Sequence, residues 1–218
     1  MNGSWTPVTI ASIVEGEGEV RALPKLLHRI AAELGVMSLR TPPPDRTPRG
    51  RLIRDGGMEA AVTAAAKRIP DAGGLLVLLD ADDDCPAQYG PRLLARARVA
   101  RPDKRIAVVL ANREYEAWFL AAAASLAGQH EFFDDLRSPD NPEVPRDCKG
   151  WLNNGRPKGR PYKETVDQER LTSIFDMKIA RAHSNSFDKF YRDVAGLLGG
   201  ATDQSITLAE RTSAGQTP

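Results

Sequence analysis

Three short apolar segments most limit the folds that this chain can adopt. They are VTIASIV at 8–14, LLVLLDADDD at 75–84, which ends in acid, and RIAVVLAN at 105–112. Their apolar residues are continuous rather than alternating, which is typical of strands buried on both faces of a sheet. The segments between them carry apolar residues at helical spacing, as in VRALPKLLHRIAAELG at 20–35. Together these patterns predict an α/β fold, with a Rossmann-like, mainly parallel central sheet flanked by helices on both faces.

The remaining helices and turns follow from the same spacing. The first strand should be followed by a turn, EGEGE, before the helix at 20–35. The Pro- and Arg-rich stretch RTPPPDRTPRGR, at 40–51, should be a mobile loop. Further helices are expected at 58–69, 91–101, 114–128 and within 169–199.

The 218 residues are enough for one large domain or for a domain with an extension. We predict an α/β core over 1–130, followed over 131–200 by a basic loop and a helical C-terminal extension packed on the core. Apolar residues are sparse in 201–218, which should be a flexible tail.

The N-terminal residues and the cysteines exclude several classes of protein. The first residues, MNGSWTPVTI, lack the basic start and the long apolar stretch of a signal peptide. No apolar run approaches the roughly 20 residues that are needed to span a bilayer. Cys85 and Cys148 form no CxxC pair, so neither a zinc ribbon nor a disulfide framework is indicated. We therefore expect a cytoplasmic protein without a membrane segment.

Acidic side chains follow each predicted strand. Glu15 follows the first, Asp80 ends the apolar part of the second, and the third leads to Glu116. Because the carboxyl ends of parallel strands meet at one edge of a sheet, these acids should converge there. Like charges this close repel, and a Mg²⁺ or Mn²⁺ ion, which prefers oxygen ligands, would offset the repulsion. Asp82 either shares a side with Asp80, if the strand persists that far, or lies with it on the loop above the sheet edge.

Two glycine motifs do not support nucleotide binding. GEG at 16–18 begins a GxGxxG fingerprint, but Arg21 stands where the third glycine is required, and a pyrophosphate there would face three carboxylates. GWLNNG at 150–155 has the glycine spacing of a P-loop, but Arg156 and Pro157 replace the Lys–Ser/Thr pair. The chain is therefore not expected to be an ATPase.

A basic segment follows the predicted core. Cations alternate with aromatic residues in WLNNGRPKGRPYK at 151–163. Such a segment suits a nucleic-acid backbone, with Trp151 or Tyr162 stacking on a base. The alternative is a solvated basic loop. Lys163 is the candidate to stabilise charge at a leaving phosphate. The predicted nucleic-acid contacts are Lys149, Trp151, Lys158 and Arg160.

These motifs resemble those of a known family. A strand ending in Glu-Gly, a nearby second acid and a later strand ending in Asp-x-Asp form the Toprim pattern of topoisomerases, DnaG-type primases and OLD-family nucleases. Here the pattern is VEGEGE at 14–19 and LLDADDD at 78–84. The segments VEGEGE, DADDDCP and ANREYEAWFLA are similar to the DUF4276 group of bacterial Toprim-like proteins. The resemblance covers 8–128 well and extends more loosely to CKGWL, YKETVDQ and NSFDKF.

The resemblance implies roles for individual residues. Glu15 matches the Toprim glutamate, a metal ligand or general acid–base group, and Glu19 matches the second acid of OLD-like versions. Asp80 and Asp82 match the Asp-x-Asp that binds Mg²⁺. The further candidate ligands are Asp84 and Glu116.

The function that follows is hydrolysis of phosphodiester bonds. Two divalent ions about 4 Å apart would stabilise the attacking and leaving oxygens. We therefore expect a Mg²⁺- or Mn²⁺-dependent Toprim-like nuclease that acts on DNA or RNA. The resemblance further implies a separately encoded ATPase as partner and a setting in defence against phage.

Two other functions remain open. A non-catalytic module would use the acidic edge to bind a structural ion or a protein partner. A phosphohydrolase would use Asp80 as a nucleophile, because DADDD superficially resembles the DxD of haloacid-dehalogenase enzymes. In those enzymes the motif follows the first strand and precedes Gly-Thr/Val, whereas here it follows a later strand.

Overall fold

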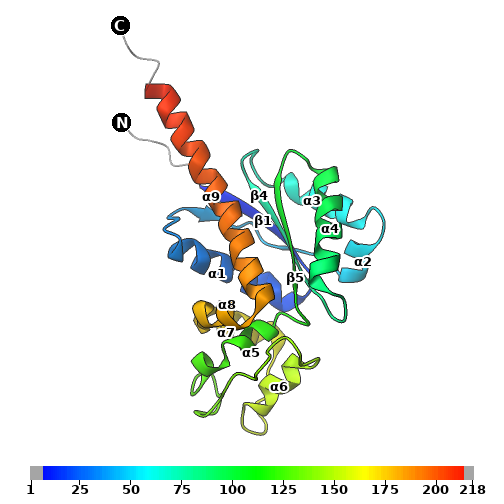
Figure 1. Ribbon diagram of the computed structural model, residues 1–218, viewed down its shortest axis with the longest axis vertical. Helices are drawn as coiled ribbons and strands as arrows, with labels where there is room; N and C mark the ends of the chain where they lie inside the picture. Colours follow the sequence, from blue (N-terminus) through cyan, green and yellow to red (C-terminus); the bar gives the residue numbers. More distant parts are fainter. Residues whose placement is uncertain (1–6, 214–218) are drawn as a thin grey trace.

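The computed structural model describes residues 7–213, and the side chains of residues 7–199. Its centre is a sheet whose paired strands all run parallel (Figure 1). The strands are β1 (Val8–Val14), β2 (Leu39–Arg40), β3 (Asp45–Arg46), β4 (Gly74–Asp80) and β5 (Arg105–Ala111). Their order is β2-β1-β4-β5, and β3 pairs with the carboxyl end of β1.

Helices cover both faces of the sheet. Successive strand residues point to opposite sides, and because the strands are apolar throughout, both faces carry apolar side chains that need to be buried. Leu76 and Val109 belong to one buried cluster, and Val77 and Val108 belong to the other. The first layer contains α1 (Glu17–Glu33) and α9 (Asn185–Ser213), and the second contains α2 (Arg49–Ile53), α3 (Gly57–Ala66) and α4 (Pro86–Ala100). The predicted α/β fold, with a parallel sheet between two helical layers, is therefore confirmed.

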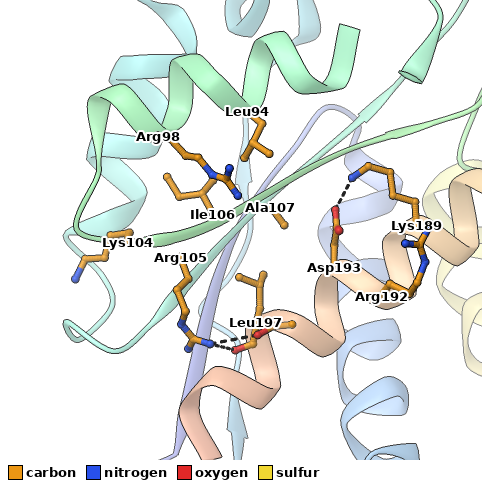
Figure 2. A pocket seen from close by; sticks show the side chains of 11 residues that line it. Leu94, Arg98, Lys104, Arg105, Ile106, Ala107, Lys189, Arg192, Asp193 and Leu197 are labelled. Atoms are coloured by element: carbon orange, nitrogen blue, oxygen red, sulfur yellow. Dashed lines mark hydrogen bonds and ion pairs between the residues drawn. The ribbon is translucent and has the colours of Figure 1, made fainter. Parts of the chain in front are cut away.

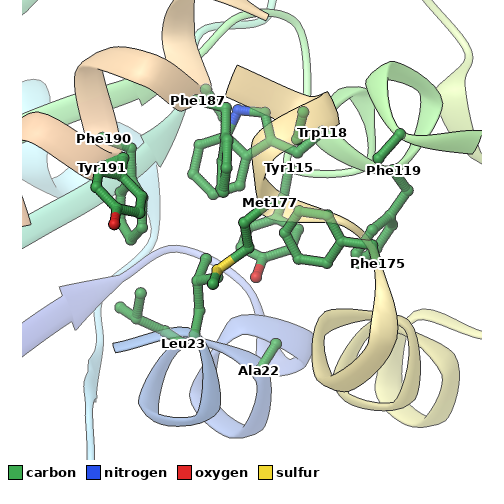
Figure 3. Close-up of a cluster of buried hydrophobic side chains, with 14 of the residues drawn as sticks. Ala22, Leu23, Tyr115, Trp118, Phe119, Phe175, Met177, Phe187, Phe190 and Tyr191 are labelled. Carbon is green, nitrogen blue, oxygen red and sulfur yellow. The ribbon is translucent and has the colours of Figure 1, made fainter. Parts of the chain in front are cut away.

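The chain beyond β5 packs against the first layer. It forms α5 (Ala117–Ala121), the 3₁₀ helix η1 (Ala123–Leu126), α6 (Cys148–Asn154), α7 (Glu164–Ile174) and α8 (Met177–His183). Aromatic rings join these elements to α9 (Figure 3). The ring centroids of Tyr115 and Trp118 lie 4.6 Å apart, and those of Phe119 and Phe175 lie 5.5 Å apart. Trp118 Nε1 also donates a hydrogen bond of 2.9 Å to Ser186 Oγ. The segment after β5 and the C-terminal helices thus share one core.

Helix α1 begins earlier than predicted. Its first residue is Glu17, so Glu17 and Glu19 lie in the first helical turn rather than in a turn before the helix. Gly16 precedes it in an extended conformation (φ −99°, ψ 168°). Carboxylates are favoured there because the unpaired N–H groups of a first helical turn carry partial positive charge. The apolar spacing that located the helix contains no information on this turn.

Two other predicted elements differ in detail. The expected loop at 40–51 contains β3 and the start of α2, and Thr47 N donates a hydrogen bond of 2.8 Å to Val14 O at the sheet edge. The expected helix at 114–128 is divided into α5 and η1 at Ala122, whose φ of −111° is not helical.

The C-terminal part contains one element that enters a predicted tail. Helix α9 continues to Ser213, within 201–218, and residues 214–218 lie outside the described residues. The division into a core over 1–130 and an extension over 131–200 stays a prediction. Among the helices of the described chain, none has the length and apolar character needed to cross a bilayer.

Candidate functional site

The acids predicted to converge follow three neighbouring strands. Glu15 directly follows β1, Asp80 is the last residue of β4, and Glu116 lies just beyond β5. Asp80 is paired in register with Ala111, the last residue of β5. Its Oδ1 accepts a hydrogen bond of 2.9 Å from the backbone N–H of Tyr115. The end of β4 is thereby fixed to the segment that carries Glu116.

Four carboxylates lie close enough together for their charges to interact. Burial raises the pKa of Asp80 well above its usual range, and the charges of Glu19, Glu116 and Glu15 raise it further. We refer to Glu15, Glu19, Asp80 and Glu116 as the carboxylate cluster. Its members come from the ends of three strands and from the first turn of α1. Only charges that lie close together raise one another's pKa in this way.

Glu116 is the most deeply buried member of the cluster, with 1% of its surface exposed. Burial raises its pKa to about 7, although Lys149 and the hydroxyl of Tyr162 act in the opposite direction. The Tyr162 hydroxyl donates a hydrogen bond of 2.9 Å to Glu116 Oε1. Tyr162 is itself buried, so its ring is committed to this contact rather than free to stack on a base.

Two cluster oxygens have no hydrogen-bond partner among the described residues. They are Oε2 of Glu15 and Oε2 of Glu19, and both are buried. Burial is also the main reason that the pKa of each of these two glutamates is raised. A buried carboxylate oxygen without a donor is costly, so these atoms are the places where a cation would contribute most.

The glycines of EGEGE allow close packing around Glu19. A Cβ atom added to Gly16 would lie 2.4 Å from Glu19 Oε2, and one added to Gly18 would lie 2.0 Å from Gln168 Oε1. Gln168, on α7, is 1% exposed, and neither atom of its amide has a partner within the described chain. The alternation of glycine and glutamate therefore lets α7 approach the start of α1 directly.

Lys149 supplies a positive charge to the carboxylate cluster. Its Nζ, at the start of α6, lies 2.8 Å from Glu164 Oε2 and 4.0 Å from Glu114 Oε2. Burial lowers the pKa of Lys149, but the charges of Glu116, Glu164 and Glu114 outweigh this and raise it above its usual range. Sequence reasoning placed Lys149 on the nucleic-acid face and did not identify Glu164. No local pattern joins 149 to 164, and only the fold, which brings the starts of α6 and α7 together, reveals the pair.

The acids after Asp80 lie on a loop, since β4 ends at Asp80. Arg49 forms ion pairs with Asp84 and, at 3.7 Å, with Asp82, while its Nε donates to Asp80 O at 3.2 Å. Asp83 pairs with Arg113 at 2.8 Å. Asp82 is exposed, yet close enough to Glu15 to raise its pKa. The predicted ligands Asp82 and Asp84 are thus bound to arginine on the outer side of the cluster.

The chemistry of the cluster fits a hard divalent cation, although its present geometry is not that of a formed metal site. Within the described residues, no three Asp, Glu, His or Cys side chains have an arrangement ready to hold a metal ion. The unpartnered oxygens of Glu15 and Glu19 are nevertheless the ligand type that Mg²⁺ and Mn²⁺ prefer. Assignment of the metal ligands therefore stays a prediction.

The predicted nucleic-acid residues do not form one continuous surface. Trp151 is half-buried against the main core, and Lys158 is exposed. Arg160 is exposed and pairs with Glu131 at 3.1 Å. Lys163 is exposed before α7, and its ammonium makes no ion pair within the described chain. The structure brings Lys149 to the carboxylate cluster and leaves Lys158, Arg160 and Lys163 at the surface.

The fold and the cluster define the class of protein: an α/β protein with a carboxylate site at the carboxyl ends of its parallel strands. Residues 14–195 match the family described as Domain of unknown function (DUF4276), and the chain belongs to that family. Comparison with curated proteins and with solved structures gave no match.

Proposed function

We propose that this protein is a Mg²⁺- or Mn²⁺-dependent nuclease of the Toprim type, which hydrolyses phosphodiester bonds in DNA or RNA. One observation carries the proposal. Burial raises the pKa of Asp80, the nearby charges of Glu19, Glu116 and Glu15 raise it further, and a buried oxygen of Glu15 and one of Glu19 lack a partner in the described chain. A divalent cation would offset this concentration of charge.

Different residues would bind the metal and contact the phosphate. Glu15, Glu19 and Asp80 would hold the metal, which when bound polarises the phosphodiester and activates water. Lys149, whose ammonium already faces the cluster, would contact a phosphate oxygen and offset its growing charge. Tyr162 would hold Glu116 in place through their hydrogen bond. Lys163 remains the other candidate for the phosphate contact.

The wider setting is proposed from the Toprim resemblance of VEGEGE and LLDADDD. Proteins of this kind are often paired with an ATPase, and such a partner, encoded separately, would regulate the present chain in a cytoplasmic response to phage. The absence of nucleotide-binding fingerprints in the sequence supports a division of labour in which this chain supplies hydrolysis alone.

Calorimetric titration with Mn²⁺ tests the proposal most directly. Wild type should bind, and Asp80→Asn, which keeps the shape of the side chain, should lose binding. Asp140→Asn is the matched control, because Asp140 is exposed and outside the cluster. Binding that survives in Asp80→Asn would contradict the metal assignment. Cleavage of single-stranded and duplex DNA and RNA should then follow the same order of variants.

A second function is favoured by the contacts of Lys149. Its ammonium lies 2.8 Å from Glu164 Oε2 and its charge lowers the pKa of Glu116, so the protein itself offsets part of the negative charge at the cluster. In this alternative the protein is a non-catalytic module, and the acidic edge binds a structural ion or a partner. Absence of Mn²⁺ binding at millimolar concentration, with an intact fold, would favour it over the nuclease.

A further inference from the structure

A second concave surface lies at the other end of β5, away from the carboxylate cluster. It has a volume of about 490 Å³ and is enclosed by α4, the first half of β5 and α9 (Figure 2). Strand β5 is at the edge of the sheet, so the groove follows an open side of the molecule. Apolar atoms of Leu94, Ile106 and Leu197 form part of its lining. We refer to this surface as the β5 groove.

The lining of the β5 groove is strongly basic. It contains a single carboxylate, that of Asp193, and five cationic side chains, which are Arg98, Lys104, Arg105, Lys189 and Arg192. Such a concentration of one sign of charge in a concave surface attracts anions.

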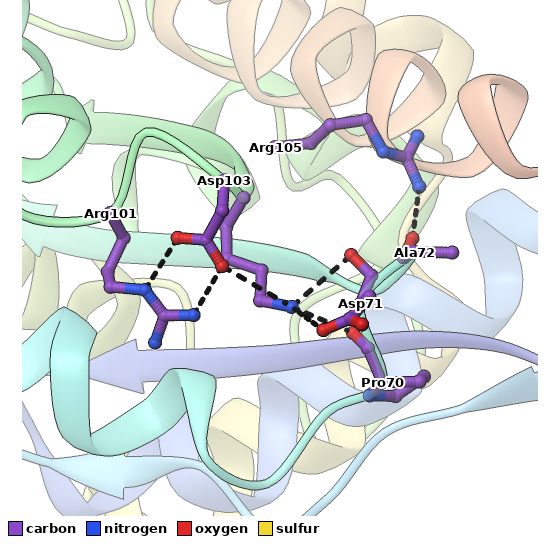
Figure 4. Close-up of polar contacts among 7 residues, drawn as sticks. Pro70, Asp71, Ala72, Arg101, Asp103 and Arg105 are labelled. Carbon is purple, nitrogen blue, oxygen red and sulfur yellow. Dashed lines mark hydrogen bonds and ion pairs between the residues drawn. The ribbon is translucent and has the colours of Figure 1, made fainter.

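Two of these cations have no carboxylate partner in the described chain. Arg105 donates only to backbone carbonyls, at 2.7 Å to Leu197 O and 2.9 Å to Ala72 O (Figures 2 and 4). Burial lowers its pKa, and no neighbouring acid raises it. Arg98 is exposed and forms no ion pair with any described residue. Arg98 is therefore free to contact a ligand, whereas Arg105 contributes a positive charge that no carboxylate offsets.

The other three cations are paired with carboxylates, and Lys189 pairs with Asp193 inside the groove (Figure 2). The side chain of Lys104 is 2% exposed, and its ammonium lies 3.2 Å from Asp71 and 3.7 Å from Asp103, so this cation is committed to the protein (Figure 4). Arg192 lies 2.9 Å from Asp188 one helical turn away, and its own side chain is 65% exposed. Exposed ion pairs such as that of Arg192 are worth at most about 1 kcal/mol, so Arg192 can exchange its partner for a phosphate.

We propose that the β5 groove binds the phosphate backbone of a nucleic acid. The proposal rests on the proposed function and extends it to a second contact. The groove and the carboxylate cluster lie at opposite ends of β5, which are six residues, or about 20 Å, apart. A chain that enters the groove would therefore reach the cluster after about six nucleotides, at roughly 3.4 Å each.

The distribution of cations favours a polyanion over a small ligand. They are spread over α4, β5 and α9, and they do not converge on one point (Figure 2). Among the lining residues there is no glycine-rich turn of the kind that cradles a single phosphate. Separate cations along an open groove suit successive phosphates, each of which is neutralised by one Lys or Arg.

Fluorescence anisotropy with labelled oligonucleotides of about 20 residues tests the β5 groove, in EDTA so that no metal site is required. The variant is Arg98→Glu with Arg192→Glu, both at exposed positions. Its matched control is Arg170→Glu with Lys178→Glu, which makes the same change of charge at exposed positions outside the groove. Thermal unfolding of both variants checks that they fold.

The groove variant should weaken binding by about tenfold or more, and the slope of log K against log salt should fall by about two, because two phosphate contacts are lost. The control should change little. Equal loss in both variants would overturn the proposal, and so would a mononucleotide that binds as tightly as the oligonucleotide. This experiment measures binding without metal, so a negative result would contradict the groove but not the proposed metal site. Conversely, a protein that binds the oligonucleotide but does not cleave it would contradict the nuclease and not the groove.

Discussion

The raised pKa of the buried acid Glu116 makes the stability of the folded protein depend on pH. The pKa of Glu116 is raised to about 7 by burial, from an unfolded value of 4.5, so the folded protein binds a proton that the unfolded chain has released. Its contribution to stability is therefore full below about pH 4.5 and is lost as the pH rises through about 7. Without metal, Glu116→Gln should flatten this loss by about 3 kcal/mol, as measured by urea unfolding from pH 4.5 to 8.

The matched control for that measurement is Asp140→Asn. Asp140 is exposed and outside the carboxylate cluster, so the loss of stability that burial of Glu116 causes should persist in this variant. If Glu116→Gln and wild type show the same profile, the Glu116 carboxyl is ionised throughout and the role assigned to burial is wrong.

Gly18 provides a test of the contact between α1 and α7. A Cβ atom there would lie 2.0 Å from Gln168 Oε1 and 2.9 Å from Glu164 Cγ. Gly18→Ala should therefore destabilise the protein by about 1–3 kcal/mol in spite of its better helix propensity. Gly196→Ala, in α9, meets no atom within 4 Å and should be neutral or stabilising by up to about 1 kcal/mol. Equal effects of the two substitutions in denaturant unfolding would contradict this account.

Single residues differ in how far the sequence could assign them. Asp80 and Glu15 could be placed because strand ends of a parallel sheet share one edge, and this rule requires no knowledge of side-chain packing. Lys149 and Glu164 could not, because they meet only where the fold brings the starts of α6 and α7 together. Tyr162 was assigned to base stacking on composition alone, whereas its hydroxyl donates to a buried carboxylate.

At the scale of elements, the strands were predictable and the short helices were not. The strand predicted at 8–14 is confirmed as β1. It could be predicted because a continuous apolar run with β-branched residues places apolar side chains on both buried faces of a sheet. Helix α6 has seven residues within a segment of charges and turns, too few to show apolar periodicity. It is nevertheless the element that delivers Lys149 to the cluster.

The N-cap of α6 allows the role of this element to be tested. Asp147 Oδ1 accepts a hydrogen bond of 2.7 Å from Gly150 N, and its loss in Asp147→Ala should cost about 1 kcal/mol. Asp176→Ala removes the corresponding cap of α8, where Oδ1 accepts from Lys178 N at 2.8 Å. Both variants should lose similar stability, but only Asp147→Ala should change Mn²⁺ affinity, because it loosens Lys149. Equal Mn²⁺ affinity in the two variants would show that α6 does not contribute to the metal site.

For the molecule as a whole, the cluster joins elements that are far apart in the sequence. Glu15 and Glu19 belong to the N-terminal part of the chain, Asp80 to the central strand β4, and Glu116 to the segment after β5. A cation bound between them would hold β1, α1 and β4 together and would be released on unfolding. Metal binding should therefore stabilise the entire fold and not only one loop.

The size of the stabilisation by bound metal follows from this linkage. At a Mn²⁺ concentration of about 100 times Kd, the folded state gains about 2.7 kcal/mol, which for a chain of this length raises Tm by about 5–10 °C. Asp80→Asn should show no rise, and Asp140→Asn should behave as wild type, since its carboxyl is exposed and outside the cluster. KCl at three times the concentration of MnCl2 matches its ionic strength and provides the control for salt. A rise of equal size in Asp80→Asn would place the ion elsewhere, whereas no rise in wild type would mean that Lys149 and solvent already compensate the carboxylates, and the non-catalytic module would then be the better account of the site.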